Sequence, residues 1–285
     1  MVVELLLVLA VFPLPYAVSA VIDLVNAAVG NGPGQRTPVL IKGHAPASFG
    51  LELVLILVPF AAAGLVAYLL SMEGPFGASR EAARQPSSGR GGEGGLAALG
   101  LDLRRLRGDL ALVIVVFVFC ELIPIYGGGI LLRAVGVHGV TPSTSGSPGY
   151  FLVLDIFTAV TSGIVEEIVV LGFLVRRLEQ LKVPGWAVVA IAVAVRGSYH
   201  LYYGWGVLPI LAWATVSVVL YRRYRRLLPF IVVHVIWDTS LFIASSMSLK
   251  SGSVFLVAEA GLLIPASFIV WLVWRSRIPL PHSAR

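Results

Sequence analysis

Charged side chains are scarce in this sequence. Only 13% of its 285 residues are Asp, Glu, Lys or Arg, whereas 58% are hydrophobic. A soluble globular domain carries about 25% charged residues. The composition therefore excludes a single water-soluble domain, because one core cannot bury so much apolar surface. Long apolar runs recur along the chain, and a membrane-spanning helix needs about 20 such residues.

Cysteine is almost absent as well. Cys120 is the only one, which excludes an internal disulfide, and its apolar surroundings indicate a core residue. The sequence also lacks the internal repeat typical of many transporters and the H-E-x-x-H helix of zinc proteases. A net charge of +6 could suggest nucleic acid. In a membrane protein we instead expect the charges to set the topology, with the lipid bilayer as a partner and no nucleic acid.

The apolar runs predict an all-α, polytopic membrane bundle of about eight transmembrane helices. The expected spans are 5–29, 49–71, 110–133, 151–175, 185–204, 206–222, 229–248 and 253–274. Pro13 and Pro15 predict a kink in the first span. The turn Gly204-Trp205-Gly206 separates the fifth span from the sixth.

Three regions follow from this pattern. Residues 1–72 hold two N-terminal transmembrane helices, and residues 110–285 form a six-helix transmembrane core. Between them, 73–109 is predicted to be a cytoplasmic linker rich in Gly, Ser and Arg. It ends in a short amphipathic helix with Leu96, Leu99, Leu103 and Leu106 on one face, or in a simple lead-in to the third span.

Basic residues are distributed unevenly between the two sets of loops. Sixteen of the 21 Lys and Arg residues follow spans two, four, six and eight, four lie on the opposite side, and Arg196 is inside a span. Cytoplasmic loops carry an excess of Lys and Arg. Both termini are therefore predicted to be cytoplasmic, in a multi-pass protein of the cell (plasma) membrane.

Several ionisable residues fall inside the predicted spans. Such residues are costly in a bilayer and are functional candidates by default. They include Glu166 and Glu167 on the fourth span, Arg196 and His200 on the fifth, and His234 and Asp238 on the seventh. Each pair on the fifth and seventh spans is separated by four residues, which predicts a shared helix face. Adjacent glutamates on a helix point about 100° apart, so only one of them can face the His and Asp side chains of this group.

Three kinds of chemistry are open to these residues. A carboxylate beside a histidine can hold and deprotonate a water, and a second histidine with a neighbouring carboxyl group can stabilise an oxyanion. Alternatively, His and Glu side chains can bind a catalytic zinc ion. The same groups could also handle protons or ions, or simply join helices.

The residues resemble a known family. Glu166-Glu167-Ile-Val-Val-Leu-Gly172, Tyr199-His200 and His234-Val-Ile-Trp-Asp238 are similar to the three motifs of the CAAX-protease and bacteriocin-processing (CPBP, or Abi) intramembrane proteases. Those motifs read EExxxR, FxxxH, and HxxxN or HxxxD. Their order, their placement on three spans and the eight-span topology match, and the similarity covers about 150–245.

The resemblance implies a role for each matching residue. Glu166 would be the general base that activates water together with His200. His234 and Asp238 would bind the oxyanion, and Glu167 would support the site or hold a partner. The family's chemistry has been described both as glutamate-type and as metal-dependent. If a metal such as Zn is used, the resemblance implies Glu166, His200 and His234 as its ligands.

Two positions depart from the family pattern. Leu171 stands where the arginine of the first motif is expected, and Arg196 stands where the phenylalanine of the second is expected. We hypothesise that Arg196 replaces the missing charge from the neighbouring helix and pairs with Glu167 or Glu166.

The predicted function is that of an intramembrane endopeptidase. It would hydrolyse a peptide bond of a membrane-associated peptide or protein, which could be lipid-modified, with a water activated by Glu166 and His200. Family substrates include prenylated CAAX tails and bacteriocin-type peptides. The alternatives are an ion- or proton-coupled transporter, and a non-catalytic membrane scaffold or immunity protein.

Overall fold

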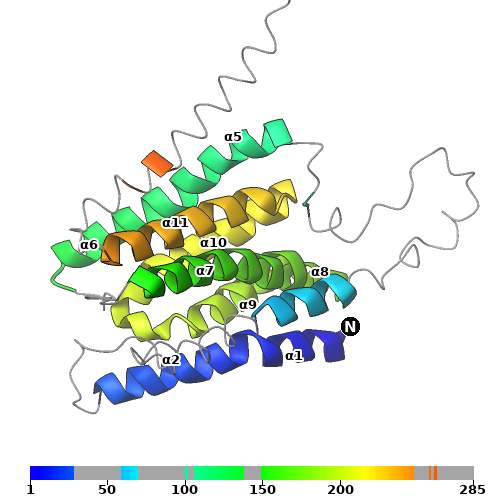
Figure 1. The fold of residues 1–285 in the computed structure, drawn as a ribbon. Helices are drawn as coiled ribbons and strands as arrows, with labels where there is room; N and C mark the ends of the chain where they lie inside the picture. The colour runs from blue at the N-terminus through cyan, green and yellow to red at the C-terminus, as the bar shows by residue number, and fades with distance from the viewer. Residues whose placement is uncertain are drawn as a thin grey trace, which may run out of the picture.

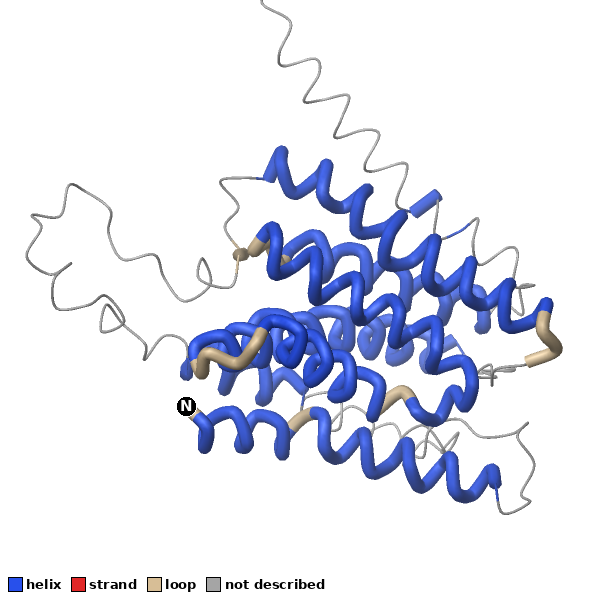
Figure 2. The backbone as a smooth tube through the Cα atoms, turned by 180° about the vertical axis from the view of Figure 1, so that it is seen from behind, coloured by secondary structure: helices blue, strands red, loops and turns tan. Residues whose placement is uncertain are grey.

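The regular structure of the chain is helical. The computed structural model describes residues 1–28, 59–69, 100–101, 106–137, 149–246, 257 and 260–261. Within these residues there are helices and no strands (Figure 2), so the all-α prediction is confirmed for them. The expected linker at 73–95 lies outside the described residues, as do nearly all of the eighth span and of the amphipathic segment before Leu106.

Within the described part of the chain, three helical rods are long and apolar enough to cross a membrane: Ala111–Ala134, Val153–Gln180 and Leu201–Tyr224. The first lies in α5 (Leu106–Val116), η5 (Phe117–Gly127) and α6 (Gly128–Ala134). The second lies in α7 (Gly149–Glu166), η6 (Glu167–Val175) and α8 (Arg176–Gln180). The third joins η7 (Leu201–Gly206) to α10 (Val207–Tyr224). η5 and η6 have π-helical geometry, and η7 is a 3₁₀ helix.

A bent pair of helices forms a fourth candidate span. α1 (Val2–Val11) and α2 (Pro13–Ala28) meet at an angle of 46°. Proline cannot donate the backbone hydrogen bond that would continue α1, so the chain bends at Pro13. The predicted kink in the first span is thus confirmed.

The remaining described helices are shorter. The apolar helices Pro59–Leu69, Gly185–Ser198 and Leu228–Ile243 fall at the expected second, fifth and seventh spans. The last two belong to α9 (Gly185–Ser198) and α11 (Leu228–Ser246). Several membrane-length apolar helices are therefore present, and the full count of eight stays a prediction.

Two predicted boundaries are wrong. α9 ends at Ser198, so His200 does not share a helical face with Arg196. Tyr199 and His200 leave α-helical geometry, with φ/ψ of −89°/1° and −106°/5°, and the chain turns again at Gly204, whose φ of 58° suits glycine. The fourth span continues past 175 to Gln180. Arg177, expected in a loop, is buried there because it pairs with Glu4 on α1.

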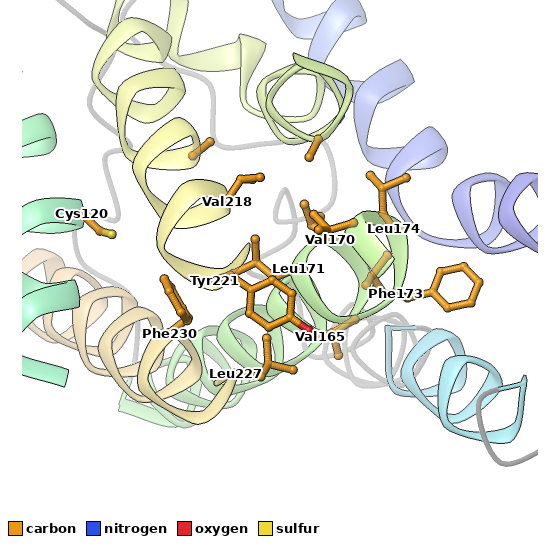
Figure 3. Packing of buried hydrophobic residues seen from close by; sticks show 14 of the residues in the cluster. Cys120, Val165, Val170, Leu171, Phe173, Leu174, Val218, Tyr221, Leu227 and Phe230 are labelled. Carbon is orange, nitrogen blue, oxygen red and sulfur yellow. The ribbon is translucent and has the colours of Figure 1, made fainter. Parts of the chain in front are cut away.

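The α7–η6–α8 rod lies inside the bundle, with α5 and the α1–α2 pair at opposite edges (Figure 1). Its middle part, η6, contacts α9 and α10. The η6 side chains are buried almost all round, which its apolar sequence permits. Figure 3 shows Leu171 of η6 packed among apolar side chains that include Val218, Tyr221 and Leu227.

A glycine sets the spacing between α7 and α11. A Cβ atom at Gly163 would lie 2.7 Å from the backbone nitrogen of Val235 and 2.9 Å from its Cα. Only glycine permits this approach, as small residues do at helix contacts in membranes. The contact lies three residues before Glu166 and directly after His234, so it brings these two residues into one region.

Ion pairs gather at one end of the bundle. They join helices or helix ends that are far apart in the sequence: Glu4–Arg177, Glu179–Arg222, Glu179–Arg225 and Asp109–Arg226. The N-terminus and the segments after the fourth and sixth spans therefore share one end of the molecule (Figure 1). The charge distribution predicts that this end is cytoplasmic.

Candidate active site

The two adjacent glutamates face different partners. Glu166 is the last residue of α7, and Glu167 begins the π-helical segment η6. Glu166 contacts the segment that follows α9, whereas Glu167 contacts Arg196 within α9 and His234 on α11. Single π-helical turns inside α-helices often occur at functional sites. The structure thus divides the expected constellation into two linked groups.

The first group consists of Glu166, Tyr199 and His200. The Tyr199 hydroxyl donates to Oε2 of Glu166 at 3.0 Å. Nε2 of His200 lies 3.7 Å from the same oxygen, which is too long for a direct hydrogen bond. Both ring nitrogens of His200 are buried. Both nitrogens lack a protein hydrogen-bond partner among the described residues.

The second group is centred on Glu167. Its Oε1 accepts a hydrogen bond from Nη2 of Arg196 at 2.8 Å and lies 2.8 Å from Nδ1 of His234. Both Arg196 and Glu167 have side chains that are only 1% exposed. Charges this deeply buried need a direct partner. The Arg196–Glu167 pair that the sequence suggested is present in the structure.

Asp238 completes this group. Its Oδ2 lies 3.3 Å from Nε2 of His234, one helical turn earlier on α11. Both ring nitrogens of His234 therefore face carboxylates. The contact with Glu167 is the shorter of the two, and it fixes the orientation of the ring. Of the side chains in the two groups, Asp238 is the most exposed, at 22%.

Two further residues belong to the site and were not selected from the sequence. Trp213 of α10 lies under the Arg196 guanidinium, 4.3 Å from its ring centroid, and meets the His234 ring edge-on at 5.1 Å. Glu121 of η5 is buried and has Trp213, His234 and Asp238 as electrostatic neighbours. An acid in an apolar run was the only sequence signal for Glu121. Nothing in the sequence distinguished Trp213 from the other tryptophans.

The residues do not fit a metal centre. Among the described residues, no group of three His, Cys, Asp or Glu side chains is arranged to hold a metal ion. The set Glu166, His200 and His234 fails for a specific reason, because both nitrogens of His234 already face carboxylates. A zinc ligand must present a free lone pair. We therefore derive no step that uses a metal.

Comparison with known families agrees with the motifs. Residues 148–240 match the family described as Type II CAAX prenyl endopeptidase Rce1-like. This region is Rce1-like. The resemblance to CAAX-type intramembrane proteases is thereby confirmed over the Rce1-like region, which contains all six of the predicted site residues. No curated protein and no solved structure gives a significant match to the chain.

Proposed function

We propose that the chain is an intramembrane endopeptidase in which Glu166 and His200 activate a water molecule. The observation that carries this proposal is the 3.7 Å separation of Glu166 Oε2 from His200 Nε2. A water at about 2.8 Å from both atoms would bridge them. The pair is largely buried, which strengthens electrostatic interactions with the reacting atoms.

The proposed reaction needs only water and the peptide. Glu166 takes a proton from the water while the water oxygen attacks the scissile carbonyl carbon. His200 orients the water through Nε2. The tetrahedral intermediate then collapses, the carbon–nitrogen bond breaks, and the proton held by Glu166 passes to the leaving amine. The products are a new carboxyl terminus and a new amino terminus.

His234 is proposed to stabilise the oxyanion. Its Nε2–H makes the longer contact, 3.3 Å to Asp238, and is proposed to donate to the negative charge that develops on the carbonyl oxygen. Glu167 holds the opposite nitrogen at 2.8 Å and keeps the ring in place. Arg196 balances the charge of Glu167. In this mechanism Glu166 does the proton transfer, and Glu167 organises the other side of the site.

The substrate is proposed to be a membrane-associated peptide. This proposal rests on the description of the matching family, which names a CAAX prenyl endopeptidase. The site residues lie on apolar helices or, for His200, directly after one, so a scissile bond must approach from the bilayer or its surface. A lipid group on the peptide would help to bring it there. The cell membrane is the proposed location.

Cleavage in proteoliposomes tests the function. Purified protein is incubated with membrane-anchored peptides, with and without a prenyl group, in water enriched in heavy oxygen, and new termini are identified by mass spectrometry. We expect Glu166→Ala and His200→Ala to abolish cleavage in folded protein, and Glu179→Gln to retain it. Unchanged turnover in either site variant would overturn the assignment. Proton-coupled uptake without cleavage would favour a transporter instead.

A further inference from the structure

Tyr199 lies between the candidate base and the N-terminal helix pair. Its hydroxyl donates to Oε2 of Glu166 at 3.0 Å, the same oxygen that faces His200. The side chain is buried, with 6% of the residue exposed. Tyr199 can take this position because α9 ends at Ser198 and the backbone turns immediately afterwards.

The other side of the Tyr199 ring contacts Phe12. The two ring centroids are 6.2 Å apart with an edge-on geometry of 63°. Phe12 is itself only 4% exposed, and its ring contacts that of Tyr16 at 5.4 Å with a tilt of 53°. Phe12 lies at the break between α1 and α2, where Pro13 bends the chain by 46°. The bend therefore places an aromatic ring directly behind the residue that holds Glu166.

A second link supports the same arrangement. α2 packs against both η7 and α9, the elements on either side of Tyr199 and His200. Tyr16 of α2 also has Glu166 as an electrostatic neighbour. The N-terminal pair thus forms one wall of the candidate site, although it lies outside the Rce1-like region at 148–240.

We propose that Tyr199 is a positioning residue for the Glu166 carboxylate and that Phe12, at the bend of the N-terminal helix pair, holds the Tyr199 ring. The proposal rests on the proposed function. A general base must be held within hydrogen-bond reach of the water it deprotonates. The Tyr199 hydroxyl restricts rotation of the carboxylate, and Phe12 restricts rotation of the tyrosine.

Kinetics separate positioning from substrate binding. Tyr199→Phe removes a hydrogen bond to a charged carboxylate. We expect this loss to lower kcat about ten- to a hundredfold, with KM unchanged. Tyr221→Phe is the matched control, because it removes the hydroxyl of a buried tyrosine on α10 whose charged neighbours are Arg225, Arg176 and Glu179, and it should leave kcat unchanged. Wild-type kcat in Tyr199→Phe, or an effect confined to KM, would overturn the proposal.

A double-mutant cycle tests the link to Phe12. Phe12→Leu keeps the site apolar but removes the aromatic contact, and it should lower kcat with little change in KM. In the Tyr199→Phe background, which retains the ring but lacks the hydroxyl, Phe12→Leu should have little further effect. Full additivity of the two substitutions would show that Phe12 does not act through Tyr199.

Infrared spectroscopy tests the positioning without relying on activity. In protein labelled at glutamate carboxyl carbons, Tyr199→Phe should shift a carboxylate stretching band that Tyr221→Phe leaves in place. The shift should vanish in a Glu166→Gln background, which assigns it to Glu166. A missing shift would overturn the positioning role. A clear shift in a protein that cleaves no peptide would leave the positioning intact and overturn the proposed function instead.

Discussion

Arg196 donates to Oε1 of Glu167 at 2.8 Å, and both side chains are 1% exposed. The family motif places its arginine on the same helix as the glutamates, but that position is Leu171 here. Leu171 is fully buried among apolar side chains (Figure 3). The cation therefore reaches Glu167 from α9 rather than from η6.

Reversing these two residues tests whether Arg196 compensates for Leu171. Arg196→Leu should abolish activity, because it leaves Glu167 buried without its cation, and breaking a buried pair costs about 3–5 kcal/mol. Adding Leu171→Arg should restore part of the activity and stability, since position 171 lies about one turn from Glu167. Peptide cleavage and thermal unfolding are the measurements. Compensation is wrong if Arg196→Leu is fully active while Leu171→Arg alone is inactive.

The adjacent glutamates should respond differently to the same substitution. Glu167→Gln removes the charge that pairs with Arg196 and is expected to lower the free energy of unfolding by about 3–5 kcal/mol. Glu166→Gln should cost far less stability, because the amide can still accept from Tyr199, yet it should lower kcat by a factor on the order of 10² or more. Denaturation in detergent and kcat are measured on both variants. Equal losses of stability would contradict this division of roles.

Metal dependence gives a third test. His234 has a carboxylate at each ring nitrogen, so we expect activity to survive dialysis against EDTA and treatment with phenanthroline. Elemental analysis should find zinc well below one ion per chain. Loss of activity with chelator and its recovery with added zinc would show that these side chains rearrange around a metal.

The predicted topology can be tested with introduced cysteines. In a Cys120→Ser background, Arg223→Cys lies at the charged end of the bundle and Val135→Cys at the other end of the α5–η5–α6 rod; both positions are exposed. A membrane-impermeant maleimide added to intact cells should label position 135 and not position 223. In inside-out vesicles the pattern should reverse. Labelling of position 223 from outside would place the charged end on the extracellular side and contradict the predicted topology.

The sequence by itself determined the class of the protein and most of its site residues. Scarce charge and recurrent apolar runs required helices in a membrane, because lipid offers no partners for exposed backbone groups. Pro13 predicted the bend, and three short motifs selected Glu166, His200, His234 and their neighbours. These features are local in the chain, so periodicity and residue type reveal them.

The tertiary structure decided which partners these residues have. Helical phase could show that Glu166 and Glu167 diverge, but not that one would face His200 and the other Arg196 and His234. The end of α9 at Ser198 put Tyr199 against Glu166. The bend at Phe12 put an aromatic ring behind Tyr199. These contacts join segments far apart in the sequence, and they depend on packing distances such as the close approach at Gly163.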